Sequence, residues 1–229
     1  MQIKDGLFLA IQDYSYLIER NYSINSVIKI VGDRYRLNSI ERHILLRGIA
    51  QKQKLLNRKN KIVDEKYIEN KNVHIDGYNL LFTISNYLNG NFCFLAMDGF
   101  IRDCANIGGR NKKNLNFEKF SEMVFEFQKV LKPSKIFIYL DEPVSMSKDD
   151  ADKLKKLLEK NKSNKNNENF EILVVKNPDS ILTEINLPDV VCTSDSIILD
   201  KANAFIFDII RWYFKNKKIK VFSIEDLSC

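Results

Sequence analysis

Three apolar runs in the later part of the chain each end in an aspartate. They occupy residues 73–76, 136–141 and 190–195, and their last residues are Asp76, Asp141 and Asp195. If these runs are parallel strands of one sheet, their carboxyl ends lie along one edge, where open α/β sheets bind ligands. Carboxylates that converge without a cation raise one another's pKa and destabilise the fold. The pattern therefore predicts a site for Mg²⁺ or Mn²⁺, which prefer oxygen ligands.

Alternating strand and helix patterns after residue 72 indicate the fold class. Strands are expected at 73–76, 92–97, 135–140, 170–175, 189–193, 204–206 and 219–222, and the longer helices at about 78–88, 117–131 and 148–160 and up to 215. This alternation predicts an α/β domain over residues 73–229, with a mostly parallel, Rossmann-like sheet flanked by helices.

Residues 1–60 show helical spacing without strand alternation. A first helix is expected to end near Asn21, and Ser23 is expected to cap a second. Asn38 or Ser39 begins a third, with Glu41 placed as its capping-box partner. These patterns predict a small all-helical region of helix-turn-helix type, followed by a linker over 61–72.

Arginines near the turn at 32–37 have two interpretations. A helix-turn-helix element would offer them to phosphates; alternatively they solvate a helical bundle or pair with its acidic side chains. The formal net charge of +6 and the isoelectric point near 9.0 are mild evidence for a polyanionic partner. The arginines in question are Arg34, Arg36, Arg42 and Arg47.

Composition excludes several classes of protein. The apolar and charged fractions are those of a globular chain, and no apolar stretch approaches the roughly 20 residues that span a bilayer. The start of the chain lacks the pattern of a secretory signal, so we expect a cytoplasmic protein without a membrane partner. Four cysteines without paired spacing and two histidines do not form a zinc pattern.

The segment after the first aspartate suits a phosphate site. Gly77 permits a turn into a helix whose first amides face the same edge of the sheet, and Asn79 is placed to fix Asp76 or a substrate oxygen. The alternative is that Asp76 only caps this helix.

The loop after the second expected strand adds charge. Asp98 and Asp103 flank Arg102, and a Gly-Gly turn at 108–109 precedes Arg110 and Lys112. This loop would grip a phosphate backbone, although its spacing is not that of a P-loop; the alternative is a charged surface loop. Lys176 ends another strand toward the same edge, whereas Asp208, Glu225 and Asp226 are expected to lie away from it.

Residues 75–79, 140–143 and 193–195 resemble the acidic motifs of the PIN-like nuclease superfamily, including its NYN and flap-endonuclease branches. More closely, the chain resembles a prokaryotic family of unknown function that joins a short helical region to a PIN-like domain. That resemblance covers nearly the full length and matches at residues 32–35, 75–79, 98–103, 141–145, 177–179 and 193–196.

The resemblance implies metal-dependent hydrolysis of phosphodiesters in RNA or other single-stranded nucleic acid. Asp76, Asp141 and Asp195 would hold Mg²⁺ or Mn²⁺, with Asp103 as the best fourth carboxylate and Asp98 or Asp200 next. The helix at 117–131 departs from the family pattern, because none of its glutamates, Glu118, Glu122 and Glu126, lies in a recognisable motif. Expected substrate-binding residues are Asn79, Ser194, Arg102, Arg110, Lys112 and Lys176.

Two other functions fit parts of the pattern. A catalytically inactive PIN-like module would bind RNA or a protein and need no ordered carboxylate cluster. A HAD-like phosphohydrolase also places an aspartate after its first strand, but it needs a second one where this chain has Tyr78.

Overall fold

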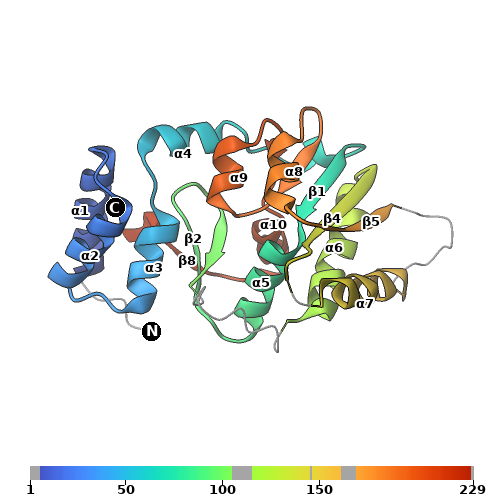
Figure 1. The fold of residues 1–229 in the computed structure, drawn as a ribbon, viewed down its shortest axis with the longest axis horizontal. Coiled ribbons are helices and arrows are strands. Elements are labelled where there is room, and N and C mark those ends of the chain that lie inside the picture. The colour runs from blue at the N-terminus through green and yellow to red at the C-terminus, as the bar shows by residue number, and fades with distance from the viewer. Residues whose placement is uncertain (1–5, 105–114, 145, 161–168, 228–229) are drawn as a thin grey trace.

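The structure is a computed structural model that describes residues 6–104, 115–144, 146–160 and 169–227. It begins with a helical region, followed by a parallel five-stranded sheet with helices on both faces (Figure 1). The fold class predicted from the sequence is thereby confirmed. In the described parts of the chain, no helix is both long enough and apolar enough to cross a membrane.

The helical region consists of α1 (Gly6–Glu19), α2 (Ile24–Arg34), α3 (Ser39–Gly48) and α4 (Lys52–Lys59). The capping box predicted for the third helix is present. The Asn38 side chain accepts from the backbone N–H of Glu41 at 2.9 Å, and the Glu41 carboxylate accepts from the N–H of Asn38 at 2.8 Å. α2 begins after Ser23, as predicted, but without a capping hydrogen bond from its side chain.

The main sheet has the strand order β5-β4-β1-β6-β7, and every pairing is parallel. Its strands are β1 (Asn72–Asp76), β4 (Lys135–Asp141), β5 (Phe170–Val175), β6 (Val190–Cys192) and β7 (Phe205–Ile206). The chain builds outward from β1 through β4 to β5 and then returns to the other side of β1. The order therefore reverses between β1 and β6, where doubly wound sheets bind their ligands.

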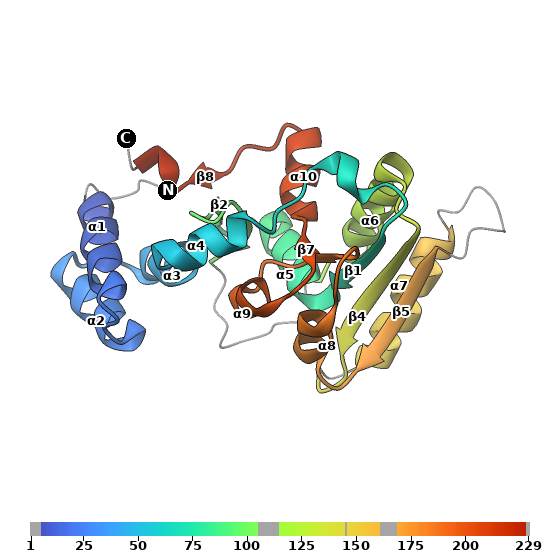
Figure 2. The ribbon, with the colours of Figure 1, turned by 90° about the horizontal axis from the view of Figure 1, so that it is seen from above.

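Helices cover the two faces of this sheet unequally. One face packs against α5 (Gly77–Leu88), α6 (Phe117–Leu131), α7 (Ser147–Lys160) and α10 (Ile209–Asn216). The other packs against α8 (Pro178–Glu184) and α9 (Ser196–Lys201). Figure 2 shows α8 and α9 on the opposite side of the strands from α6 and α10. Because side chains alternate along a strand, Val73 and Ile75 point toward the layer of α5, α6, α7 and α10. Asp76 therefore points toward the layer of α8 and α9.

Two of the expected strands belong to a separate sheet. β2 (Cys93–Leu95) pairs with β3 (Ile101–Asp103) and with β8 (Phe222–Ser223), in the order β3-β2-β8. Phe94 and the nearby Ile224 lie in the apolar core of the helical region. Gly48, at the end of α3, lies so close to both side chains that a Cβ there would collide with them. This packing diverts the predicted strands 92–97 and 219–222 from the main sheet.

The segment 61–72, expected to be a linker, is part of the α/β fold. The backbone N–H of Val63 donates to the carbonyl of Ile206 at 3.1 Å, and the N–H of Ile206 donates to the carbonyl of Lys61 at 2.9 Å. A short 3₁₀ helix, η1 (Glu65–Ile68), follows. The segment pairs with the edge strand β7, whose backbone groups would otherwise face water.

Candidate active site at the switch point of the sheet

Asp76 and Asp195 lie on either side of the point where the strand order reverses. Asp76 ends β1, and Asp195 follows β6 by three residues. Thr193 connects them, because its hydroxyl donates to Asp76 Oδ2 at 2.8 Å and accepts from the backbone N–H of Asp195 at 3.0 Å. Thr193 is buried, and the side chain of Asp76 is nearly so. Two of the three strand-ending aspartates are thus brought together.

Asn79 holds the loop after β6 against the start of α5. Its Oδ1 atom accepts from both the backbone N–H and the hydroxyl of Ser194, each at 2.9 Å. Its own backbone N–H points to Asp76 Oδ1 at 3.4 Å, which makes Asp76 the N-cap of α5. Asn79 and Ser194, both expected to bind substrate, therefore bind each other.

Gly77 is required by the close approach of α5 to β4. A Cβ at this position would lie 2.6 Å from the carbonyl oxygen of Tyr139, which is closer than real Cβ atoms come to backbone. The glycine lets α5 begin directly after Asp76, so that Asn79 reaches the loop after β6.

Burial raises the pKa of Asp76 to about 7. That value already includes the negative charges of Asp195 and Asp179, which also raise the pKa, and the hydrogen bonds from Thr193 and Asn79, which lower it. Asp76 is therefore a buried carboxyl group whose ionisation is disfavoured, with two more carboxylates near it. A cation at this point would stabilise the ionised form.

Asp179 is a site residue that sequence reasoning missed. It lies in the first turn of α8, which follows β5 but packs against β1 and β4. Asn177 caps α8 by accepting from the N–H of Ser180 at 3.1 Å, and Pro178 occupies the first helical position. This signature shows in the sequence that a helix begins soon after a strand. The sequence does not show that this helix then packs back against β1 and β4.

Asp141 lies at the same edge, on the neighbouring strand β4. The register pairs Asp76 with Tyr139, so Asp141 extends two residues further along the strand direction. Its charge acts on Tyr78, whose pKa is raised mainly by burial and also by its hydrogen bond to Asp150. In the described residues, no group of three or more histidine, cysteine or acidic side chains is arranged to hold a metal ion.

Asp98 and Arg102 form a buried ion cluster instead of contacting Asp76. Two guanidinium nitrogens of Arg102 donate to the two oxygens of Asp98, each at 2.7 Å, and Arg58 donates to Asp98 at 2.8 Å. Burial alone would raise the pKa of Asp98, but these guanidinium groups outweigh it and lower the pKa. Arg102 also donates through Nε to the carbonyl of Ser194 at 3.0 Å. Asp98, expected to bind metal, and Arg102, expected to bind substrate, therefore brace the loop after β6.

Asp103 lies on the second sheet, beside the helical region. Arg47 donates to its backbone carbonyl at 2.7 Å and pairs with its carboxylate at 3.4 Å. Thr83 of α5 lies 3.4 Å from the same carboxylate. The structure thus places this expected fourth ligand between α3 and α5. Asp200, which was expected to be an alternative metal ligand, forms an ion pair with Arg58, with 2.6 Å between Asp200 Oδ1 and Arg58 Nε.

Residues 65–212 match the domain of unknown function DUF5616. The chain belongs to this family. Residues 6–61 match a second family, described as a protein of unknown function, DUF434. An uncharacterized protein of Methanocaldococcus jannaschii is 32% identical over 200 residues, which cover 87% of this chain and 92% of that protein. No solved structure matches this chain.

The DUF5616 part contains the four carboxylates of the candidate site, namely Asp76, Asp141, Asp179 and Asp195. The DUF434 part contributes Arg47 and Arg58, which reach into the DUF5616 part at Asp103 and Asp98. Lys176 is exposed just after β5, whereas Arg110 and Lys112 lie outside the described residues. Asp208 caps α10 two residues after β7, so it is closer to the strand ends than expected.

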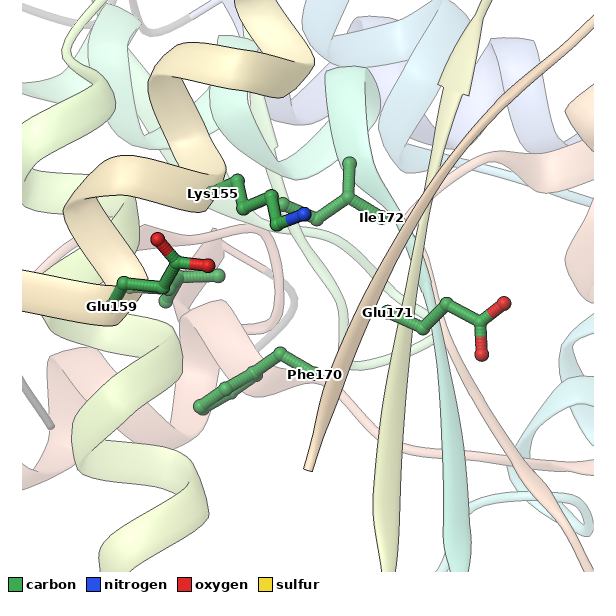
Figure 3. A pocket seen from close by; sticks show the side chains of 6 residues that line it. Lys155, Glu159, Phe170, Glu171 and Ile172 are labelled. Carbon is green, nitrogen blue, oxygen red and sulfur yellow. The ribbon is translucent and has the colours of Figure 1, made fainter. Parts of the chain in front are cut away.

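A hollow of about 190 Å³ lies elsewhere in the DUF5616 part. It is formed by the last turns of α7 and the first half of β5, and Figure 3 shows Lys155 and Glu159 on the helix side and Phe170 and Ile172 on the strand side. By register Phe170 and Ile172 are level with Val73 and Ile75, but they lie two strands away on the edge strand β5 and face α7, on the other face of the sheet from α8 and α9. The hollow therefore takes no part in the candidate site.

Proposed function

We propose that this DUF5616 protein is a Mg²⁺- or Mn²⁺-dependent nuclease that hydrolyses phosphodiesters in RNA or other single-stranded nucleic acid. One observation carries the proposal. At the point where the strand order reverses, a buried aspartate with a pKa raised to about 7 lies near two more carboxylates. Doubly wound sheets bind ligands at this point, and perturbed carboxyl groups gather at functional sites.

The chemistry of these donors, although not their arrangement in the described residues, suits a hard divalent cation. Asp76, Asp195 and Asp179 offer carboxylate oxygens, and Asp141 lies at the same edge on the adjacent strand. Mg²⁺ and Mn²⁺ favour such oxygen ligands. Asp76 and Asp195 would hold the ion, and Asp141 and Asp179 would complete the set. When bound, the ion would activate water and neutralise charge on the phosphate.

The remaining residues orient this set. Thr193 fixes Asp76 through its hydroxyl, and the bonds between Ser194 and Asn79 fix the loop that carries Asp195. Burial raises the pKa of Asp76 to about 7, so without a cation its protonated form persists toward neutral pH. A bound cation would favour the ionised form of Asp76, and the displaced proton would pass to solvent.

A second function, a catalytically inactive nucleic-acid-binding module, also rests on a specific observation. Asp76 and Asp195 both act as helix N-caps, and Asp195 Oδ1 accepts from the N–H of Ile197 at 2.7 Å. Capping stabilises a helix by about 1 kcal/mol and needs no metal. These two aspartates therefore have a structural use even in a protein without catalysis.

Labelled single-stranded RNA, incubated with the full chain in Mn²⁺, separates the two functions. Wild type and an Asp149→Asn/Asp152→Asn control should cleave, because these two acids lie on the exposed side of α7. An Asp76→Asn/Asp195→Asn variant should not. Calorimetry should show Mn²⁺ binding to wild type and control only. RNA binding by wild type with neither cleavage nor Mn²⁺ binding would establish the inactive module, and cleavage by the double variant would refute the proposed site.

A further inference from the structure

The positive charge of this chain is concentrated in its helical region. Residues 6–61 contain eleven of the 36 lysines and arginines but only four of the 30 acidic residues, a formal charge of +7. Residues 62–229 contain 24 basic and 25 acidic residues. The whole surplus of +6 therefore belongs to about a quarter of the chain. A basic charge confined to one region is the electrostatic footprint of a polyanion-binding surface.

Four of these basic side chains bind other groups of the protein. Arg42 donates to the carbonyls of Leu37 and Ile28 and to Asp33. The others, Arg47, Arg58 and Lys61, bind groups of the α/β part. The helix-turn-helix interpretation therefore loses Arg42 and Arg47 as phosphate contacts. The exposed basic side chains are Arg20, Lys29, Arg34, Arg36, Lys52, Lys54 and Lys59.

Three of the exposed basic residues, Arg20, Lys52 and Lys54, lie in segments that are joined to one another. Gln51, just before α4, donates from its amide to the carbonyl of Ile18 and to the side chain of Asn21, each at 2.8 Å. The carboxylate of Glu19 accepts from the backbone N–H of Lys52. These contacts join the end of α1, which is followed by Arg20, to the start of α4.

From there α4 leads to the candidate site. Lys54 pairs with Asp200 of α9 at 3.2 Å, and Arg58 lies 3.4 Å from the carbonyl of Ser196. α9 begins at Ser196, immediately after Asp195. Figure 1 shows α4 extending from the N-terminal helices to α9. The side chain of Lys54 is 51% exposed and Asp200 already pairs with Arg58, so solvent screens the Lys54–Asp200 pair and leaves Lys54 available to a phosphate.

Exposed aromatic side chains accompany the first of these segments. Tyr16 and Tyr22 are each 57% exposed, although tyrosine usually buries most of its ring. The guanidinium group of Arg20 lies 3.5 Å from the centre of the Tyr16 ring. Aromatic rings and guanidinium planes beside basic side chains are the elements on which the bases of a single strand stack. A duplex has its bases already stacked and gains little from them.

We propose that this surface, named the α4 track and formed by Tyr16, Arg20, Tyr22, Lys52 and Lys54, binds single-stranded nucleic acid and leads it toward Asp195. The binding itself follows from the charge and the aromatic rings. Only the destination rests on the proposed function, because a strand on α4 reaches the loop that carries Asp195. The helical region thus supplies the affinity, and the α/β part supplies the carboxylates.

Fluorescence anisotropy with labelled oligouridine in EDTA tests the track without any metal. An Arg20→Gln/Lys52→Gln/Lys54→Gln variant should reduce the slope of log Kd against log salt by about 2, since each phosphate contact on a single strand contributes roughly 0.7. A Lys129→Gln/Lys153→Gln/Lys156→Gln control removes the same charge from exposed positions on α6 and α7 and should keep the slope. A Tyr16→Leu/Tyr22→Leu variant should weaken binding on the order of ten-fold and leave the slope unchanged.

The outcomes separate the track from the nuclease. Equal losses in the track variant and its control, or tighter binding of duplex than of single strand, would overturn the track. An arm with oligothymidine shows whether the strand is RNA or DNA. If only the track variant loses binding, and wild type does not cleave in Mn²⁺, the α4 track is supported and the proposed nuclease activity is refuted. If the track variant cleaves with an unchanged KM, the α4 track is refuted and the proposed nuclease activity is not. Thermal melting of each variant verifies that it folds.

Discussion

Replacing Asp76 with asparagine should stabilise the protein in the absence of metal. Asp76 is 8% exposed, and its pKa is raised from the usual 3.8 to about 7, first by burial and then by Asp195 and Asp179. The ionised carboxylate is therefore disfavoured in the folded state. Asparagine has nearly the same shape, caps helices equally well and carries no charge.

The magnitude follows from linkage between protonation and folding. Between pH 3.8 and about 7 the folded chain holds a proton on Asp76 that the unfolded chain has lost, so stability falls as the pH rises through this window. A pKa rise of this size corresponds to roughly 4 kcal/mol of lost stability above the window. Asparagine has only one side-chain oxygen to accept the hydrogen bonds from the Thr193 hydroxyl and the Asn79 backbone N–H. The loss of one of these two bonds costs about 1 kcal/mol of stability. The Asp76→Asn variant should therefore gain about 3 kcal/mol at about pH 8 and less than about 1 kcal/mol at about pH 5.

Urea unfolding in EDTA, measured at both pH values, gives the free energy of unfolding directly. In thermal melts the gain at the higher pH should appear as a Tm several degrees higher, at about 2–4 °C per kcal/mol for a chain of this size. Asp149→Asn serves as the control, because the exposed Asp149 should leave the difference between the two pH values unchanged. An Asp76→Asn variant no more stable than wild type at the higher pH would refute the reasoning. So would an advantage equal at both pH values, since it would have another source than ionisation.

Three further substitutions test the contacts around this site. Arg58→Ala should lower the free energy of unfolding by about 3–5 kcal/mol in urea melts, because it leaves the buried Asp98 with one guanidinium partner fewer; no change would mean that Arg102 alone satisfies Asp98. Gly77→Ala should destabilise by about 1–3 kcal/mol in the same assay, since its Cβ would meet the carbonyl of Tyr139 at 2.6 Å, and an unchanged midpoint would contradict this close approach. Thr193→Val should cost about 1–3 kcal/mol above pH 7 and less at low pH, because the carboxylate that loses its donor is ionised only at the higher pH; a loss independent of pH would point to packing.

The sequence predicts the main sheet well because the relevant signals are local. A buried run, a terminal carboxylate and a glycine that begins a helix lie within a few residues around Asp76. The capping box at Asn38 and Glu41 is equally local, and the structure confirms it. The pairing of β2 with β8 is not local, since the two strands lie far apart in the chain and meet because Phe94 and Ile224 fill the core of the helical region.

Long-range contacts also decide which of the candidate carboxylates lie near Asp76, and the sequence does not show these contacts. Asp98 and Asp103 follow an expected strand, as a metal ligand would, but their partners Arg58 and Arg47 come from helices about 40 and 56 residues earlier. Arg102 is near Asp98 in the sequence, but nothing there indicates the second guanidinium group, that of Arg58, at 2.8 Å. Asp179 is the opposite case, because α8 carries it from beyond β5 to the vicinity of Asp76. Composition and spacing identify candidate ligands, and long-range packing selects among them.

The two family regions are joined through the same contacts that shape the candidate site. Arg58 of the helical region binds Asp98, Asp98 holds Arg102, and Arg102 binds the carbonyl of Ser194 next to Asp195. Each group in this series is buried or nearly so, and an unpaired charge there costs several kcal/mol. The helical region therefore cannot leave the α/β part without exposing apolar surface at Phe94 and leaving a buried charge short of a partner. The surface proposed to bind nucleic acid on α4 and the loop that carries Asp195 are thus parts of one folded unit, so a strand bound to the first would lie in a fixed position relative to the second.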